Sequence, residues 1–256
     1  MKKIIHLSDL HIGYEDCGAK FRQIVENITL LKQPSKNYVI VITGDIVDNA
    51  TNEAQIVEAL DAIDELKKRG YDVLPIPGNH DYGTGSWGHK KYIELFKKTF
   101  YGSSDFEYPK VDIIDKILFV GLDSTAEELH WYDCMLSQGE IGEGQLKELE
   151  CIINKAEYSK LKKVIYLHHH PFDFEIGMSL KDRKKLRPII ENKIDALLFG
   201  HYHGDFNSAG KNFNGTWGIP RAYNAGSTTH KQGNTGIHRI INLKTMARED
   251  YDGIFI

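Results

Sequence analysis

The chain has 256 residues, and its composition, 41% hydrophobic and 27% charged, is that of a globular protein and excludes a disordered one. The formal net charge of −4 at pH 7 argues against a dedicated nucleic-acid binder, because such proteins usually carry a basic face. Cys17, Cys134 and Cys151 lie far apart and form no CxxC pair, so they indicate reduced thiols in a cytoplasmic protein. The apolar run at the N-terminus is too short for a secretory signal, and no window reaches the length of a membrane span.

Strands and helices alternate along the sequence, with no internal repeat and no linker rich in glycine or proline. Short apolar runs rich in β-branched residues predict strands over residues 3–7, 38–43, 72–75, 117–121, 163–167 and 196–199. Apolar residues at helical spacing predict helices over residues 21–31, 56–66, 90–100, 143–158 and 182–191. From Trp217 to Leu243 we expect shorter strands joined by glycine-rich turns.

The order of these elements predicts the fold class. Early alternation of strand and helix indicates parallel strands joined by crossover helices, and the β-rich tail indicates a second, mixed sheet. We therefore expect an α/β protein built as a four-layer αββα sandwich, with two mixed β-sheets flanked by helices. The length is ordinary for one domain, so residues 1–256 are expected to form a single domain.

Asp, Asn or His follows five of the predicted strands at the point where each strand ends. The five segments are Ser8-Asp9-Leu10-His11, Gly44-Asp45-Ile46-Val47-Asp48, Pro77-Gly78-Asn79-His80-Asp81, His168-His169-His170-Pro171 and Gly200-His201-Tyr202-His203. Strand ends of this kind share one crevice in an α/β sheet. A divalent transition metal accepts imidazole nitrogen and carboxylate oxygen together, and two such ions need a ligand between them. The segments therefore predict a two-metal site.

Each segment has an ordinary explanation when it is taken alone. Asp-x-His occurs by chance, Gly-Asp is common in turns, and a single histidine is usually solvated or satisfied in the core. The pair His201 and His203 is more specific, because alternate residues of an extended chain point the same way. Glycines at positions 44, 78 and 200 would also allow the backbone to approach the ions closely. Together the five segments indicate chemistry far more strongly than any one of them.

These segments resemble the calcineurin-like metallophosphoesterase superfamily. The resemblance spans residues 9–203 with every block present, and Asn224-Ala225-Gly226-Ser227 is similar to a further family segment. It implies one metallophosphoesterase domain with two divalent ions. The mixture of nitrogen and oxygen donors suits Mn, Fe, Zn or Co and does not distinguish among them. The family pattern implies these metal ligands: Asp9, His11 and His203 for the first ion, Asn79, His169 and His201 for the second, and Asp45 as the bridge.

The choice of His169 follows the family's spacing, in which the ligand lies two residues before the proline. His168 is then expected to face the opposite side, and His170 to border the substrate pocket. His80 resembles the family histidine that contacts the phosphate and protonates the leaving group. Nucleophilic attack would come from a hydroxide that bridges the two metals, so no serine or cysteine nucleophile is needed.

Two further carboxylates belong to the same segments. The resemblance implies that Asp48 and Asp81 orient histidines or the neighbouring backbone, although an aspartate that caps a turn or a helix is an equally good explanation.

The substrate class is indicated less directly. Protein Ser/Thr phosphatases of the superfamily carry Asp-Arg-Gly after the second segment and Glu after Gly-Asn-His. This chain has Asp48-Asn49-Ala50 and Asp81 instead, so the arginine that clamps phosphate is missing. The Gly-Asn-His-Asp and His-x-Pro forms are more similar to bacterial class III cyclic-nucleotide and glycerophosphodiester phosphodiesterases. We expect a phosphodiesterase acting on small or nucleotide-type diesters.

Two alternatives stay open. The first is a nuclease or a nucleotide pyrophosphohydrolase on the same fold. The negative net charge of the chain disfavours the nuclease. The second is a non-catalytic scaffold, although scaffolding members lose metal ligands and none is missing here. No membrane or protein partner is evident in the sequence. Trp87 and His89 could line one wall of a substrate pocket and His130-Trp131-Tyr132 another, with ordinary loop packing as the alternative.

Overall fold

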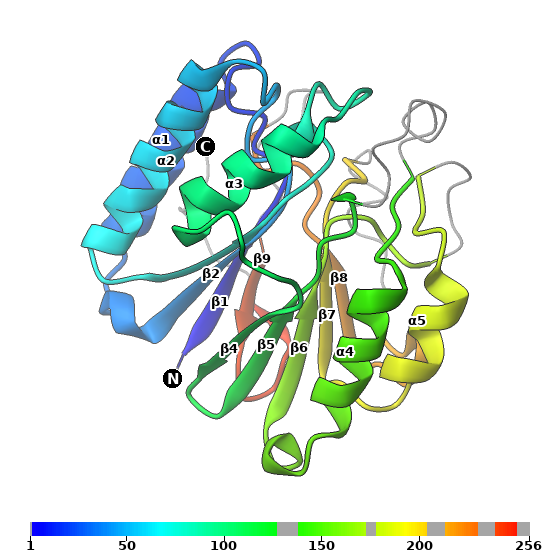
Figure 1. Cartoon of the computed structure of the whole chain (residues 1–256). Coiled ribbons are helices and arrows are strands. Elements are labelled where there is room, and N and C mark those ends of the chain that lie inside the picture. Colours follow the sequence, from blue (N-terminus) through cyan, green and yellow to red (C-terminus); the bar gives the residue numbers. More distant parts are fainter. Residues whose placement is uncertain (1, 127–137, 173–177, 204–212, 230–238, 250–256) are drawn as a thin grey trace.

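The computed structural model describes residues 2–126, 138–172, 178–203, 213–229 and 239–249. Two five-stranded sheets lie face to face, and helices cover the outer face of each sheet (Figure 1). This arrangement confirms the predicted αββα sandwich of two mixed sheets. No helix within the described ranges is long and apolar enough to cross a membrane.

The first sheet has the strand order β10-β9-β1-β2-β3. Its parallel strands are β1 (Lys3–Leu7), β2 (Tyr38–Thr43) and β3 (Asp72–Ile76), whereas β9 (Arg239–Asn242) and β10 (Arg248–Glu249) add antiparallel pairings. Every residue of β2 is buried, which explains its unbroken apolar sequence: β2 has a neighbour on each edge and a layer on each face.

Three helices cover the outer face of the first sheet. They are α1 (Cys17–Thr29), α2 (Glu53–Lys68) and α3 (Lys90–Tyr101). The side chain of Asn52 caps α2 by accepting the N–H of Ala54 at 3.2 Å, and α3 ends at a left-handed glycine, Gly102. The apolar stripes of these helices pack on alternate residues of β1 and β2.

The second sheet has the order β4-β5-β6-β7-β8. Four of its strands are parallel, β5 (Ile117–Gly121), β6 (Lys162–Tyr166), β7 (Ala196–Phe199) and β8 (Arg221–Asn224), and the edge strand β4 (Lys110–Ile114) is antiparallel to β5. Its outer face is covered by two helices, α4 (Glu143–Asn154) and α5 (Arg183–Ile190). Short 3-10 turns complete the described chain at Ser35–Asn37, His80–Tyr82, Ala156–Tyr158 and Thr216–Gly218.

Strand alternation divides the apolar residues among three layers of core. Along β2, Ile40 and Ile42 face the helices, whereas Val39 and Val41 face the second sheet. The layer between the sheets also contains Phe119 of β5. Because β1 to β3 and β5 to β8 are parallel within their sheets, the loops that follow them can gather at one end of the sandwich.

The predicted strands and helices are present, but several bounds differ. The helix expected over residues 21–31 spans Cys17–Thr29, and residues 230–238 of the expected β-rich tail lie outside the described ranges. β4 was not predicted, β6 begins and ends one residue earlier than expected, and the helix expected over residues 143–158 ends at Asn154 before a separate 3-10 turn. Residues of β4 alternate between half-buried and exposed, so this strand lacks the continuous apolar run that identified the others.

Candidate metal centre

The first group of ligand-type side chains joins the loops after β1, β2 and β7. Asp9, His11, Asp45 and His203 each bring one donor atom into a common cluster. Nε2 of His203 lies 3.0 Å from Oδ1 of Asp9 and 3.0 Å from Nε2 of His11. The backbone N–H of His201 donates to the other oxygen of Asp9 at 3.0 Å, so the two loops are joined through this carboxylate.

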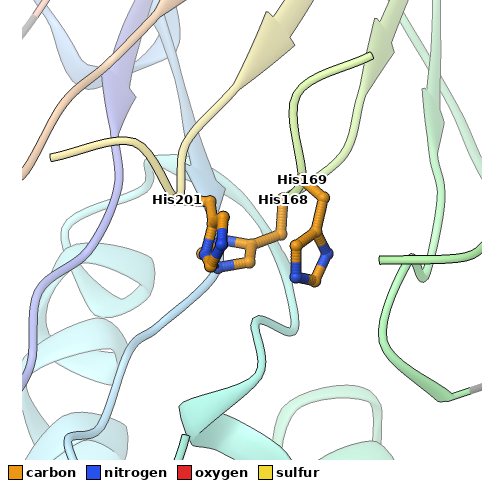
Figure 2. A group of neighbouring side chains, drawn as sticks. All are labelled: His168, His169 and His201. Atoms are coloured by element: carbon orange, nitrogen blue, oxygen red, sulfur yellow. The ribbon is translucent and has the colours of Figure 1, made fainter. Parts of the chain in front are cut away.

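The second group lies beside the first and combines loops from both sheets. Nε2 of His168 is 3.1 Å from Oδ1 of Asn79 and 3.1 Å from Nδ1 of His201. The amide nitrogen of Asn79 donates to the carbonyl oxygen of Gly85 at 3.0 Å, which turns its oxygen toward the histidines. Figure 2 shows His168 and His201 with the neighbouring His169 at this end of the second sheet.

Asp45 lies between the two groups. Its Oδ2 is 3.4 Å from Nε2 of His168 and 3.9 Å from Nε2 of His11, while its Oδ1 accepts the backbone N–H of His80 at 2.9 Å. One carboxylate therefore reaches histidines that belong to different sheets.

The expectation that His168 faces the opposite side is wrong. Val164 and Tyr166 face the first sheet, Ile165 and Leu167 face the helices, and the alternation continues beyond the end of β6. His168 therefore also points toward the first sheet, where its Nδ1 donates to the carbonyl oxygen of Thr43 at 2.7 Å. The remaining nitrogen, Nε2, is the one that meets Asn79 and His201.

His169 occupies a different place in the same cluster. Its Nδ1 lies 2.9 Å from Oγ of Ser124, and its buried Nε2 has no hydrogen-bond partner among the described residues. Its ring lies 4.4 Å from that of His201, centroid to centroid, and His168, His169 and His201 together form a group that could hold a metal ion. Two adjacent histidines thus reach the site, and His168 has the closer set of neighbouring donors.

The backbone is held in an unusual conformation at these positions. Asp9, His11, Asp45 and His201 have positive φ angles of 50°, 42°, 49° and 65°. Non-glycine residues rarely adopt this region, and such strain is typical of functional sites that the surrounding structure over-determines. The close packing explains one of the glycines, because a Cβ on Gly78 would overlap the carboxylate of Asp45.

His80 and Asp48 lie at the edge of the first group. Nδ1 of His80 contacts the carbonyl oxygen of Asp48 at 2.6 Å, and Nδ1 of His11 lies 3.2 Å from Oδ1 of Asp48. The rings of His11 and His80 meet edge-on, with centroids 4.7 Å apart. The His80 side chain is partly exposed, at 26% of its surface.

Asp81 is buried behind the site and accepts three backbone N–H groups. Its Oδ1 accepts from Ile46 and Val47 at 3.0 Å each, and its Oδ2 accepts from Gly78 at 2.8 Å. Burial and the nearby charge of Asp45 raise the pKa of Asp81 to about 7, against the effect of these hydrogen bonds. The carboxylate fixes the backbone next to both Asp45 and Asn79.

Buried charges determine where protons reside when no cation is bound. Burial alone would lower the pKa of His168, but the charge of Asp45 raises it to about 9. Burial and the charge of His168 lower the pKa of His169, and burial and the neighbouring His169 lower that of His201, both well below the ordinary value. Burial would raise the pKa of Asp45, and His168 and His80 bring it well below its ordinary value. His168 therefore carries the proton of the second group near pH 7.

The donor set fits two divalent cations. Ligands that share one ion at about 2.1 Å and at right angles lie about 3 Å apart, which matches the spacing within each group. The second ring nitrogens of His11 and His168 contact Asp48 and Thr43, as is usual for metal-bound histidine. The buried Nε2 of His169, for which the described part of the chain supplies no hydrogen-bond partner, adds a further donor atom to the second group.

The residues expected to contact substrate are less closely tied to this site. His170 is fully buried, with Nδ1 3.0 Å from the carbonyl oxygen of Phe172. The Trp87 side chain is 65% exposed, and His89 caps α3 by accepting the N–H of Lys91 at 3.1 Å. None of the three belongs to a metal-ligating group within the described residues. His130, Trp131 and Tyr132 lie outside the described residues.

Sequence reasoning missed two buried residues at the end of β5. Asp123 accepts a hydrogen bond from the hydroxyl of Tyr82 at 2.7 Å, and Ser124 contacts His169. Burial raises the pKa of Asp123, and the hydrogen bond from Tyr82 opposes this shift. The available signal was their place directly after a predicted strand, as at the five segments that were recognised.

The family profile described as calcineurin-like phosphoesterase matches residues 2–205 of the chain. The chain belongs to the calcineurin-like phosphoesterase family. It is therefore a metal-dependent phosphoesterase, in agreement with the resemblance of its motifs.

The individual relatives share 15–26% of their residues with this chain. A protein named probable glycerophosphodiester phosphodiesterase GpdQ from Arcobacter nitrofigilis is 26% identical over 218 residues, which cover 78% of this chain and 71% of that protein. The calcineurin-like phosphoesterase YfkN from Bacillus subtilis has a TM-score of 0.51 at 19% identity, covering 88% of this chain and 81% of that one. GAP50, described as the anchor in the inner membrane complex of Plasmodium, has a TM-score of 0.54 at 15% identity, with coverage of 99% and 79%. The two structural likenesses show the shared fold.

Proposed function

We propose that this phosphoesterase is a phosphodiesterase that hydrolyses small or nucleotide-type diesters at a pair of divalent cations, within a single domain over residues 1–256. The observation that carries the proposal is the position of Asp45 between two groups of ligands, 3.4 Å from His168 and 3.9 Å from His11. A carboxylate shared in this way is what two neighbouring cations need to remain close together.

The proposal assigns each donor to a cation. The first cation would be held by Asp9, His11 and His203, the second by Asn79, His168 and His201, and Asp45 would contact both. His169, the ligand expected from the family spacing, lies in the same group of histidines and stays a candidate ligand of the second cation. Bound Mn, Fe, Zn or Co would offset the charge of the phosphate oxygens and make water a nucleophile near neutral pH.

His80 is the residue proposed to complete the reaction. The N–H at Nδ1 donates to the carbonyl oxygen of Asp48, so Nε2 is the ring nitrogen that would deliver a proton to the leaving alkoxide. Its backbone N–H is held by Asp45, which keeps the ring next to the proposed cations. The carbon–oxygen bond of the leaving group stays intact, and the phosphorus–oxygen bond breaks as the alkoxide takes the proton.

Support for a diester comes from the likeness to the protein named probable glycerophosphodiester phosphodiesterase and from the missing arginine after Asp48. A monoester dianion is more highly charged, and an arginine next to the metals would help to bind it. The net charge of −4 disfavours a long nucleic acid as substrate.

The test is turnover by metal-free protein reloaded with Mn²⁺. We expect hydrolysis of bis(p-nitrophenyl) phosphate to exceed that of p-nitrophenyl phosphate. A panel of glycerophosphodiesters, cyclic nucleotides, nucleotide sugars and single-stranded DNA then separates a small-diester enzyme from a pyrophosphohydrolase or a nuclease. Asp45→Ala should abolish turnover, whereas Asp61→Ala, at an exposed position of α2, should not change it. Activity in Asp45→Ala with full metal content would overturn the assignment.

A further inference from the structure

Two ligand-bearing loops of the site come from different sheets. Asn79 follows β3 and His168 follows β6, and their donor atoms lie 3.1 Å apart although 89 positions separate them in the sequence. The two sheets share no paired strands within the described ranges. The distance between these loops must therefore be set by packing and by side-chain hydrogen bonds.

Asp123 is bonded to the loop that carries Asn79. The carboxylate accepts the hydroxyl proton of Tyr82 at 2.7 Å, and Tyr82 ends the 3-10 turn that directly follows Asn79. The Tyr82 ring is fully buried and meets Phe96 of α3 edge-on, so the hydroxyl has a fixed direction. The other carboxylate oxygen accepts the N–H of Thr125 at 2.8 Å, which orients the acceptor.

Ser124, the next residue, is bonded to the loop that carries His168. Its Oγ lies 2.9 Å from Nδ1 of His169 and accepts the backbone N–H of His169 at 3.2 Å. Both bonds act on the residue directly after His168. Adjacent residues at the end of β5 thus contact the two ligand loops, one each.

The pair is itself anchored to a helix. Gln145 of α4 accepts the N–H of Asp123 at 3.1 Å and donates to its carbonyl oxygen at 2.8 Å. Both backbone groups of Asp123 are therefore held by one side chain. Such an anchor gives the pair a fixed position from which to hold the two loops.

We propose that Asp123 and Ser124 are positioning residues that set the distance between the Asn79 and His168 loops, and hence the affinity of the second cation site. The inference rests on the proposed function, because it assumes that Asn79 and His168 bind one cation. Groups that orient metal ligands typically contribute about 10–100-fold to metal affinity.

The test compares Tyr82→Phe and Ser124→Ala with Tyr71→Phe. The hydroxyl of Tyr71 also makes a buried hydrogen bond of 2.7 Å, to the carbonyl oxygen of Ile28, within the core between the first sheet and its helices. Tyr71→Phe therefore matches Tyr82→Phe, because each removes one tyrosine hydroxyl and one buried hydrogen bond. Metal-free proteins are titrated with Mn²⁺ by calorimetry, and unfolding is followed in parallel.

We expect Tyr82→Phe and Ser124→Ala each to weaken the second Mn²⁺ site about 10–100-fold, and Tyr71→Phe to stay within about twofold of the unchanged protein. Asp123→Asn should retain most of the affinity, because its amide can donate to the oxygen of Tyr82. If Tyr82→Phe does not fold, Ser124→Ala decides the question.

The proposal is overturned if Tyr82→Phe and Ser124→Ala bind Mn²⁺ as Tyr71→Phe does, or if Asp123→Asn is as weak as Tyr82→Phe. Failure of the proposed function would look different, since the unchanged protein would bind two Mn²⁺ ions and hydrolyse no diester.

Discussion

A proton on His168 occupies the position at which the second cation would bind, so cation binding must release it. Nδ1 of His168 already donates to the carbonyl oxygen of Thr43 at 2.7 Å, and a second proton can only sit on Nε2. Burial disfavours that proton, but the charge of Asp45 raises the pKa of His168 to about 9. Nε2 is the nitrogen 3.1 Å from Asn79, so proton and cation compete for the same atom.

The size of the effect follows from this pKa. At pH 7, two units below a pKa of about 9, roughly one molecule in 100 has a free Nε2. Binding of the second cation should therefore be about 100-fold weaker at pH 7 than above pH 9, which corresponds to about 2.7 kcal/mol. The direction of the pH dependence follows, because the cation must displace a proton that a raised pKa holds more tightly. The affinity of the second site for the cation is therefore lost as the pH falls below 9.

Chelator competition with Mn²⁺ between pH 6.5 and 9 measures this dependence, and calorimetry in buffers of different ionisation enthalpy counts the protons released. We expect about one proton for each second-site cation at pH 7 to 8. His168→Ala should bind Mn²⁺ weakly at the second site, and its affinity should no longer change with pH in this range. His169→Ala should keep the slope, because burial and the charge of His168 hold the pKa of His169 well below this range.

Equal affinity at pH 7 and pH 9 in the unchanged protein would refute the reasoning. A slope that survives in His168→Ala would also refute it, since another group would then carry the proton.

Three further outcomes are expected. Chelation of the cations should lower the melting temperature, and Mn²⁺ at 100 times its dissociation constant should restore about 2.7 kcal/mol; an unchanged melting temperature would show that the folded state binds no metal. Asp81→Asn in the Mn²⁺-loaded protein should cost about 1–3 kcal/mol in urea unfolding, because its amide cannot accept the N–H of Gly78; a stability equal to that of the unchanged protein would contradict this. Gly85→Ala should lower kcat about tenfold or more, because φ is +82° and the new Cβ would overlap the His80 ring. Full activity would remove His80 from the proposed chemistry.

Most of the sandwich could be predicted because its strands bury apolar residues on both faces. β2 is the clearest case, with all of its residues buried and its sequence apolar throughout. β4 was not predicted because it is an edge strand with alternating exposure. Its exposed Val111 and Ile113 flank Asp112, so it has no continuous apolar run.

The direction in which His168 points could not be predicted from spacing alone. His168 and His169 are neighbours, and a shift of one residue along a strand reverses the face to which a side chain points. The predicted strand ended at Leu167, whereas β6 ends at Tyr166, and only the packing of Tyr166 and Leu167 on opposite faces shows the direction of His168.

The contacts of Asp123 and Ser124 could not be predicted, because their partners are distant in the sequence. Tyr82 and His169 lie 41 and 45 positions away along the chain, and neither bond leaves a local pattern. An Asp-Ser pair after a strand is also common in turns. Only the position of both loops relative to β5 distinguishes this pair from an ordinary turn.

Asp9 and His203 touch at 3.0 Å although they are 194 positions apart in the chain. Contacts between such distant segments are costly in loop entropy and form late in folding. The first cation site is therefore absent until both sheets have assembled, and a cation cannot guide the early steps. We expect bound metal to slow unfolding and to leave the folding rate almost unchanged, so that metal supply governs how long the folded protein persists.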